Sequence, residues 1–511
     1  MWQQLLKPVD YVIDQLSMYR LLMYYLLFLL VAAMGLSATG VIHYNAVDIA
    51  LAAGITTFAC WIINRVFAYT FNAPVNPESS ILTGLILSLI ITPSFQTYGL
   101  LFMLAASGLA IASKYLLTIR NKHIFNPAAI AVVLTAIGPR QDASWWIGTA
   151  WMLPFVIVGG LLIVRKVRRG SMVAAYLIAT TVVTAGLSLY DKSSVTLNLK
   201  NMILTSAIFY LGFVMLTEPY SSPTTRTKQI YYAIIVGVLV APQFHVGHYY
   251  TTPEVALVIG NLFAYLVSPK TKLFPVLREK LKVARDTAEF VFIPDRRLAY
   301  LPGQYMEWTL PHEHADSRGS RRWFTLSSSP TEKFLRVGVK FVANGSSYKD
   351  AMLDMDNQTP IVAAQVAGDF VMPESKKKKL AFIAGGIGIT PFRSMIKFLI
   401  DKQQPRDIVL LYSAKTVDDV AYRSVFDQAK ESIGLRTTYF ITGKQSPPPE
   451  EQNFVRGMIS PETIKRKIPD YNDRLFYISG THQMVEAVTE MLMDIGVDRG
   501  SIKTDFFPGY A

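Results

Sequence analysis

The sequence predicts a multi-domain chain: an all-α transmembrane bundle of about ten helices, then a β-barrel, then an α/β domain. Hydrophobic residues make up 51% of the 511 residues, and the mean hydropathy of +0.29 is high for a soluble protein. The long apolar stretches all lie before residue 270, and the periodicity beyond them is that of strands and then of alternating strands and helices. The predicted segments are 1–270 for the bundle, 271–285 for a basic linker at the lipid headgroups, 286–375 for the barrel and 376–511 for the α/β domain.

The bundle is predicted from a series of apolar stretches, judged against the roughly 20 residues that cross a bilayer. Two of them are short, which a tilted, broken or re-entrant segment can accommodate where its backbone faces protein or a cavity. The predicted spans lie near 20–38, 46–70, 79–93, 97–117, 126–138, 144–164, 172–190, 201–217, 229–243 and 253–268.

Lys and Arg residues are distributed unevenly between the joints of these spans. If the N-terminus, with Lys7 and Arg20, is cytoplasmic, the joints on that side hold most of the basic residues. We therefore expect a multi-pass protein of the cell (inner) membrane, with an even number of spans and with the remainder of the chain in the cytoplasm. The net charge of +13 is then better explained by contact with the lipid bilayer than by nucleic acid.

Cysteine and histidine usage limits the cofactors. The single cysteine, Cys60, excludes a disulfide framework and a cysteine-ligated iron–sulfur cluster. His43, His245 and His248 fall in the non-cytoplasmic joints and His123 at the opposite face, so they do not form a ladder of haem ligands. The outer three histidines are interpreted as solvated loop residues, with a metal or acceptor site as the alternative. No metal ligand is assigned.

Three stretches put polar residues at span boundaries on the predicted cytoplasmic side, at 76–87, 122–129 and 216–225. Such residues can cap helices, since hydroxyls accept from exposed N–H groups and proline suits a first turn. Alternatively, the N-termini of half-helices point toward an anionic ligand within the membrane. The residues proposed to contact such a ligand are Thr83, Asn126, Thr217 and Glu218.

The same stretches resemble the flavin-carrying membrane subunits of two redox pumps, the B subunit of the sodium-pumping NADH:quinone oxidoreductase and the D subunit of the Rnf complex. The matching residues are Thr83-Gly84-Leu85, Lys122 to Ala128 and Thr217-Glu218-Pro219, where the family has Thr-Asp-Pro. The Ser/Thr-Gly-Ala-Thr sequence that carries covalent FMN in this family is missing, and Thr184-Ala185-Gly186-Leu187 stands in the expected region. The resemblance therefore implies non-covalent FMN or riboflavin, or a quinone, in the membrane domain.

The barrel is predicted from alternating apolar and polar residues at 281–310 and 333–343. Within it, Arg321 to Ser328 place arginine, aromatic and hydroxyl side chains on one strand. Such groups can bind a phosphate, cover a flavin ring and reach a ring nitrogen, although an amphipathic strand with solvated arginines is the alternative. Gly345 to Tyr348 then lead hydroxyl groups into a helix, which provides a second place for an anion.

These residues together resemble the ferredoxin–NADP reductase family. Its Arg-x-Tyr-Ser/Thr motif is similar to Arg322 to Thr325, with Phe324 in place of tyrosine, and its Pro-Gly-Gln-Tyr strand is similar to Pro302 to Tyr305. The resemblance implies bound FAD. The cofactor-binding residues that it implies are Arg322, Trp323, Phe324, Thr325, Val339, Lys340, Gly345, Ser346 and Ser347.

The last domain opens with a glycine-rich loop, Gly385 to Pro391, between a strand-like run and a predicted helix at 392–400. This arrangement can bind a pyrophosphate on backbone N–H groups, although such a turn is often only a connection. Strand-like runs at 380–384, 407–412, 437–442 and 475–479 alternate with helical stretches and predict a parallel sheet.

The loop is similar to the nicotinamide dinucleotide loop of the reductase family, and Tyr477 to Met484 resemble its Cys-Gly-Pro…Met signature, with Ser479 in place of cysteine. A terminal aromatic residue shields the flavin in that family, and here it is assigned to Phe507 or, second, Tyr510. Lys415 and Lys444 are candidates for binding the 2′-phosphate of NADPH, or ordinary surface lysines, so NADH and NADPH both stay open. The resemblance implies catalytic roles for Thr325, Thr390, Ser479 and Phe507, and NAD(P)H binding by Gly385, Gly386, Gly388, Thr390, Pro391, Gly480 and Met484.

These features predict an oxidoreductase that passes electrons from cytoplasmic NAD(P)H through FAD to a flavin or quinone in the membrane domain, and on to quinone or an extracytoplasmic acceptor. The alternative is a redox-linked, ion-translocating subunit of a larger respiratory complex. Charge within the spans would favour ion movement, and Arg65 is the one such charge that the sequence reveals. A homodimer is left open.

Overall fold

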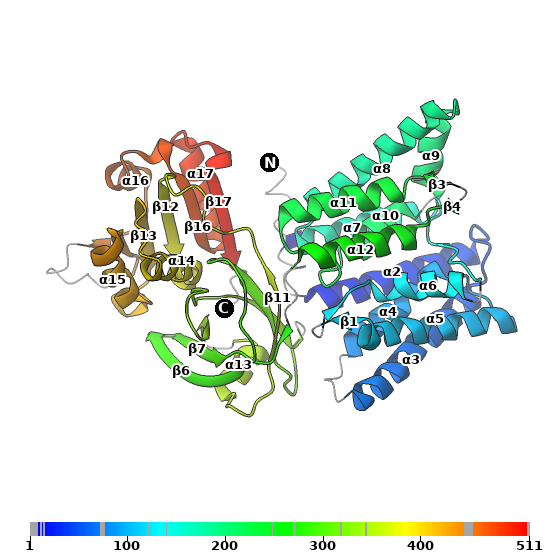
Figure 1. Ribbon diagram of the computed structural model, residues 1–511, viewed down its shortest axis with the longest axis horizontal. Coiled ribbons are helices and arrows are strands. Elements are labelled where there is room, and N and C mark those ends of the chain that lie inside the picture. Colours follow the sequence, from blue (N-terminus) through cyan, green and yellow to red (C-terminus); the bar gives the residue numbers. More distant parts are fainter. Residues whose placement is uncertain are drawn as a thin grey trace. The chain divides into compact units, whose positions relative to one another are not determined.

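The computed structural model describes residues 9–10, 13, 16–71, 77–119, 122–138, 140–205, 207–242, 244–247, 249–268, 272–316, 319–342, 345–443 and 453–507. The chain divides into two compact units, Met1–Lys270 and Thr271–Ala511. We call them the first and the second unit. Figure 1 shows that the first is built mainly of helices and the second of sheets with flanking helices.

Asparagine side chains cap two helices of the first unit. Asn45 accepts a hydrogen bond from the N–H of Val47 at the start of α3, and Asn126 accepts one from Ala129 at the start of α6, where Pro127 fills the first turn. The helices are α2 (Met18–Ala38), α3 (Ala46–Thr70), α4 (Pro77–Ile90), α5 (Thr97–Leu116), α6 (Pro127–Ile137), α7 (Leu153–Val167), α8 (Gly170–Tyr190), α9 (Val195–Thr205), α10 (Ile208–Tyr210), the π-helix η1 (Leu211–Met215), α11 (Arg226–Leu239) and α12 (Pro253–Val267).

Among the described residues, four helices are long and apolar enough to cross a membrane: α2, α3, α5 and α8. The bent pair formed by α9 with Ile208–Met215 would make a fifth, and α6, α12 and most of α4 are shorter apolar helices. The prediction of about ten spans is therefore not established by helix length. The short segments at 79–93 and 126–138 are indeed short helices, of 14 and 11 residues for α4 and α6.

The second unit begins with two antiparallel sheets in the segment that was predicted as a barrel, and we call this part the barrel region or, for short, the barrel. One has the order β10-β7-β6 and the other β5-β11-β8-β9, and a bridge between Leu326 and Val337 joins β9 to β10. Phe290, Phe292 and Trp308 pack in its core. The strands are β5 (Lys272–Leu273), β6 (Val276–Ala284), β7 (Thr287–Ile293), β8 (Tyr305–Thr309), β9 (Arg321–Thr325), β10 (Leu335–Lys340) and β11 (Val362–Ala367), with α13 (Ser347–Asp354) after β10.

The predicted basic linker at 271–285 is wrong, because β5 and β6 occupy this segment. Leu277 packs in the core of the two sheets, whereas Arg278, Glu279 and Lys280 after it are exposed. The barrel therefore starts within a few residues of α12.

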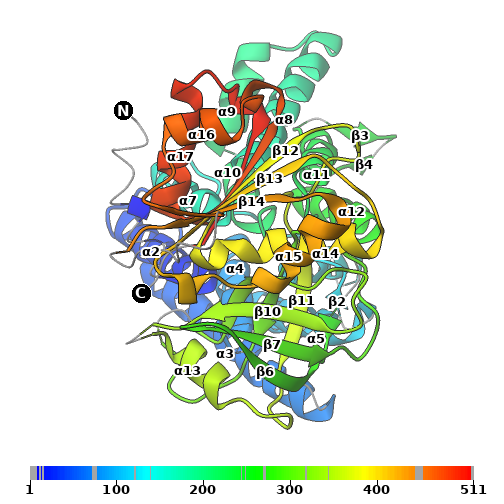
Figure 2. The same ribbon diagram turned by 90° about the vertical axis from the view of Figure 1, so that its left-hand side faces the viewer.

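The rest of the second unit is a six-stranded parallel sheet with the order β15-β14-β13-β12-β16-β17. Figure 2 shows α14 and α15 below this sheet and α16 and α17 above it, and separate apolar clusters fill the two faces. The four predicted strands are present, and the sequence did not reveal β15 and β17. The elements are β12 (Leu380–Gly385), α14 (Thr390–Asp401), β13 (Ile408–Ala414), α15 (Arg423–Ile433), β14 (Arg436–Ile441), β15 (Phe454–Arg456), α16 (Pro461–Lys467), β16 (Leu475–Thr481), α17 (His482–Asp494) and β17 (Ile502–Phe507), with the 3₁₀ turn η2 (Gly386–Ile389) after β12.

A buried arginine joins the strands at the amino edge of this sheet. The Arg474 guanidinium binds Asp470 and both carboxylate oxygens of Asp407, and it donates to the carbonyl of Leu380. Hydrogen bonds from Arg474 and Lys379 lower the pKa of Asp470 below its ordinary value. Burial alone would raise the pKa of Asp407, but hydrogen bonds from Arg474 and Arg436 hold it below the ordinary value.

This network makes the stability of the second unit sensitive to acid. Because the pKa of Asp470 is lower in the folded state, its contribution is complete above the unfolded pKa of about 3.9 and is lost as the pH falls through the folded value. We expect the D470N variant to unfold about 2–4 °C below the unsubstituted protein at pH 6, and the difference to become smaller at pH 2. Thermal unfolding of the detergent-solubilised protein, followed by near-ultraviolet circular dichroism, tests this. An equal difference at both pH values would contradict it.

Candidate functional site

The first candidate site is a pocket in the first unit. Its cavity volume is about 40 Å³, which leaves room for a few water molecules. All four residues predicted to contact a membrane cofactor, Thr83, Asn126, Thr217 and Glu218, line it. The other lining residues are Met18, Tyr19, Leu22, Ser79, Leu82, Ile86, Pro127, Ala128, Ile163, Val167 and Val214. The lining therefore combines hydroxyl, amide and carboxylate groups with apolar side chains.

Glu218 is held at the polar end by amide and hydroxyl donors. Its Oε2 atom accepts hydrogen bonds from Asn126 Nδ2 at 2.7 Å and from Ser221 Oγ at 2.8 Å. The backbone N–H of Asn126 in turn donates to Asn261 Oδ1 at 2.8 Å, which ties α6 to α12. The π-helix η1, whose extra residue alters the helical register, ends two residues before Thr217.

Lys114 belongs to this site and escaped the sequence analysis. Its ammonium group donates to Thr83 Oγ1 at 2.8 Å and to Ser79 Oγ at 2.9 Å. Arg65 was expected to be the one charge well inside a span; Lys114, in the last turn of α5, and Glu254, buried in the first turn of α12, are further charged residues near helix ends. Arg65 packs over the ring of Trp61, at 4.1 Å from its centre. Thr184, in the region where the family carries FMN, is buried within α8.

The second candidate site lies at the carboxyl edge of the parallel sheet. The strand order of this sheet reverses at β12, because β13 follows on one side of it and β16 lies on the other. In α/β sheets, ligands bind in the crevice at such a reversal, which here lies between β12 and β16. Gly385, Gly388 and Gly480 meet there. A Cβ atom on Gly388 would lie 2.3 Å from the carbonyl oxygen of Ser479, and one on Gly385 would lie 2.0 Å from the sulfur of Met484. Only glycine allows this approach of the two loops.

The predicted NAD(P)H-binding residues are thus brought together. Gly386 has a φ of +53° with open space around it, and Thr390 and Pro391 form the buried first turn of α14. The Ser479 side chain is buried, and its Oγ atom has no hydrogen-bond partner among the described residues. An orphaned hydroxyl at this point fits a nicotinamide amide, which would supply the missing bond. Phe507 ends β17 beside Thr481, whereas Tyr510 and Lys444 lie outside the described residues, as does His248 of the first unit.

The third candidate site is the barrel face that carries β9 and the start of α13. The guanidinium of Arg322 donates to the carbonyl of Gly319 at 2.8 Å and to Asp316 at 3.1 Å, and it lies over the ring of Tyr348. The Ser347 hydroxyl accepts from the N–H of Asp316 at 2.9 Å and contacts His312 at 3.0 Å. Asp316 and His312 therefore join the predicted residues, although no motif pointed to them.

The other predicted flavin residues lie on the same strands. Phe324 packs against Tyr348, and the ring of Trp323 is partly exposed beside Tyr305. Ser346 caps α13, and Gly345 precedes it. The residues at the end of β10 come next to the nucleotide loop: a Cβ on Gly338 would lie 2.9 Å from Thr390 Cγ2 and 2.4 Å from the Tyr422 hydroxyl. Val339 is buried, and the carbonyl of Lys340 accepts from Lys349 Nζ.

Tyr422 lies where the barrel and the parallel sheet meet. Burial, and then the carboxylate of Glu289, raise the pKa of this phenol well above its ordinary value. Tyr422 therefore stays neutral at physiological pH and can donate a hydrogen bond.

Thr325 offers a direct test of the flavin site. Its hydroxyl is buried, and Oγ1 has no hydrogen-bond partner among the described residues, as expected for a group that binds a flavin ring. We expect the T325V variant to bind FAD about 10-fold more weakly, because a net hydrogen bond of about 1–1.5 kcal/mol is lost. The unfolding temperature of the FAD-free protein should not fall, because that state loses no bond.

Titration of the FAD-free protein with FAD, followed by flavin fluorescence, measures this affinity. Thr437, in β14, also has a buried hydroxyl without a described partner, so the T437V variant is the matched control and should bind FAD normally. An unchanged affinity in T325V would contradict the assignment.

Comparisons with known proteins match both units. Residues 382–490 match the family described as the oxidoreductase NAD-binding domain, and residues 141–273 match the NQR2, RnfD, RnfE family. The two resemblances inferred from the motifs are thereby confirmed. The second match includes Thr217 and Glu218, whereas Thr83 and Asn126 precede it.

Individual relatives match a little less than half of the chain. The flavohemoprotein of Oceanobacillus iheyensis is 27% identical over 246 residues, which are 46% of this chain and 58% of that protein. The glycine betaine monooxygenase reductase subunit of Chromohalobacter salexigens is 23% identical over 225 residues, 43% of this chain and 60% of that protein. The chain thus spans less than two thirds of each of these relatives. A solved flavohem-like FAD/NAD binding domain of nitric oxide dioxygenase from Vibrio cholerae O1 biovar El Tor is 21% identical, covering 46% of this chain and 98% of that chain with a TM-score of 0.40.

Proposed function

We propose that the protein is a membrane-bound NAD(P)H oxidoreductase that delivers electrons from FAD in the second unit to a flavin or quinone in the pocket of the first. The observation that carries this proposal is the convergence of glycines and the Ser479 hydroxyl between β12 and β16, in a chain that also contains the pocket around Glu218. The two units belong to one polypeptide, and few residues separate α12 from β5. The reductase unit is then cytoplasmic, according to the distribution of basic residues.

Each group of residues has a physical task in this reaction. The loop from Gly385 to Pro391 would bind the pyrophosphate of NAD(P)H on its N–H groups, and Ser479 would hold the nicotinamide amide. Arg322, which is now paired with Asp316, would bind the FAD pyrophosphate, and Thr325 would donate to the flavin ring. FAD held by these residues would supply the chemistry of accepting a hydride from NAD(P)H and of passing on two electrons singly, with release of one proton.

The pocket residues would receive the second carrier. Asn126, Thr217, Thr83 and Glu218 present hydrogen-bonding groups to its polar edge, and the apolar lining excludes water from the remainder. Lys114, which donates to Thr83, adds a positive charge that would stabilise a reduced, anionic ring.

The test is an anaerobic reaction of the purified protein in lipid nanodiscs with NADH and, separately, NADPH. Reduction of FAD followed by bleaching of a second flavin, or by reduction of an added quinone, is expected. FAD reduction without either later event would contradict the membrane step. Acid extraction of the same sample would identify which cofactors dissociate and which stay attached.

A second function, redox-linked ion movement within a larger complex, is favoured by one observation. Lys114 and Glu254 are charged groups on apolar helices, and Glu254 is buried. Proteoliposomes containing the protein would then accumulate an ion on addition of NAD(P)H, whereas simple electron transfer predicts no net ion flux.

A further inference from the structure

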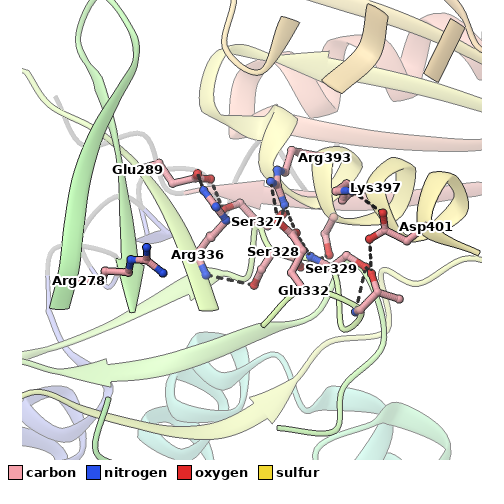
Figure 3. A network of polar contacts seen from close by, with 12 residues as sticks. Arg278, Glu289, Ser327, Ser328, Ser329, Glu332, Arg336, Arg393, Lys397 and Asp401 are labelled. Atoms are coloured by element: carbon pink, nitrogen blue, oxygen red, sulfur yellow. Dashed lines mark hydrogen bonds and ion pairs between the residues drawn. The ribbon is translucent and has the colours of Figure 1, made fainter. Parts of the chain in front are cut away.

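A closed ring of buried and half-buried charged side chains joins the barrel to the first helix of the parallel sheet (Figure 3). The guanidinium of Arg393, on α14, donates to both carboxylate oxygens of Glu332, with Nη2 3.0 Å from Oε1, and Nη1 also donates to the carbonyl of Ser327 at 2.9 Å. The Arg393 side chain is 6% exposed and that of Glu332 14%. A bidentate pair with so little solvent allows one relative placement of the two segments.

The ring continues through a second arginine and a second glutamate. Glu332 contacts Arg336 Nε at 3.3 Å, and Arg336 Nη1 binds Glu289 at 2.7 Å. Glu289 accepts from the Ser327 hydroxyl at 2.9 Å, which returns the ring to the residue that Arg393 binds. Two arginines thus balance two carboxylates.

The position of this ring in the chain gives it a functional meaning. Ser327 lies two residues after Thr325, the residue assigned to the flavin ring, and Arg393 lies three residues after Thr390, the residue assigned to the nicotinamide. Ser394 adds a hydrogen bond of 2.6 Å from its hydroxyl to the carbonyl of Ser328. These contacts therefore join the flavin-binding and nicotinamide-binding segments two to four residues after the residues assigned to the reacting rings.

We propose that Arg393 is a positioning residue for hydride transfer: its bond to Glu332 and Ser327 sets the distance between the flavin and nicotinamide segments. This inference rests on the proposed transfer from NAD(P)H to FAD. Transfer requires the reacting atoms to lie about 3–3.5 Å apart, and a misplacement of about 1 Å can cost a factor of about 100 in rate. Loss of the contacts between Arg393, Glu332 and Ser327 should therefore slow hydride transfer more than it weakens the binding of either cofactor.

The experiment compares R393Q, E332Q, the double variant R393Q/E332Q and R393K, using the full-length protein with FAD. R393Q should slow FAD reduction by NAD(P)H about 10- to 100-fold in anaerobic stopped-flow measurements, with a larger deuterium isotope effect on the transferred hydride. R393K keeps the charge but not the bidentate geometry, and it should slow reduction several-fold. The matched control is K397A, on the same helix, because Lys397 pairs with Asp401 within α14 and the variant keeps the hydrogen bond from Thr331 to Asp401; its rate should not change.

The double variant separates positioning from folding. It removes both buried charges, so its unfolding temperature should exceed that of R393Q, while FAD reduction stays slow. Hydrogen–deuterium exchange of FAD-free protein should show faster exchange in residues 326–334 in R393Q and in the double variant, but not in K397A. A double variant that reduces FAD at the unsubstituted rate, or unchanged exchange in these residues, would overturn the positioning role. Failure of NAD(P)H to reduce FAD in the unsubstituted protein would overturn the proposed function and this inference with it.

Discussion

Replacing Gly388 by alanine or valine is expected to reduce NAD(P)H oxidation by at least about 100-fold while FAD stays bound. A Cβ at this position would lie 2.3 Å from the Ser479 carbonyl oxygen and 2.6 Å from the N–H nitrogen of Gly480. Both contacts are backbone atoms of β16, so the loop must move away from the strand. A shift of about 1 Å is enough to cost this factor, since the same loop would bind the pyrophosphate and align the nicotinamide.

The measurement is the rate of FAD reduction over a range of NADH and NADPH concentrations. FAD content should stay normal, because the barrel has its own apolar core around Phe290 and Trp308. Gly434, which follows α15, is the control: it has a φ of +73° and open space around it, so the G434A variant should lose some stability and no activity. Normal kinetics in G388A would contradict the assignment of this loop.

Replacing Glu218 by leucine should leave reduction of FAD by NAD(P)H intact and slow the next electron transfer about 10- to 100-fold. The carboxylate accepts from Asn126 and Ser221, and leucine would leave both donors without this acceptor beside the pocket. The polar end of the pocket would rearrange, and the ring that it holds would lose its orientation. The E218Q variant keeps an acceptor oxygen and should show a smaller effect.

Two-phase stopped-flow spectra distinguish the steps, because FAD reduction is recorded first and bleaching of a second flavin or reduction of added quinone follows. Glu254 provides the matched control, since it is a buried carboxylate of the same unit that binds the indole N–H of Trp145 at 2.8 Å and does not line this pocket. E254Q should leave both phases unchanged. A second phase of normal rate in E218L would show that the acceptor does not bind in this pocket.

Local sequence determined much of this protein. The change of periodicity near residue 270 separated the apolar helices from the strands. The glycine-rich loop located the turn between β12 and α14, because glycine allows backbone conformations that other residues rarely adopt. The segment at 271–285 was predicted wrongly as a linker at the headgroups because of its lysines and arginines. Its strand β6 buries only Leu277 and Ala284, in contacts that exist only in the folded protein. Strands as short as β15 carry too few residues for a visible pattern.

Only the tertiary structure decided which distant residues meet. Thr83, Asn126 and Glu218 are separated by more than forty residues at each step, yet they line one pocket, and Lys114 joins them because helix packing brings α5 against α4. The ring from Arg393 to Glu289 likewise combines residues from four places in the chain, and a single charged residue in a sequence does not reveal its partner. Residues that are close in the sequence determine the secondary-structure elements. The sites form only on folding, because packing brings distant side chains together and removes water from them.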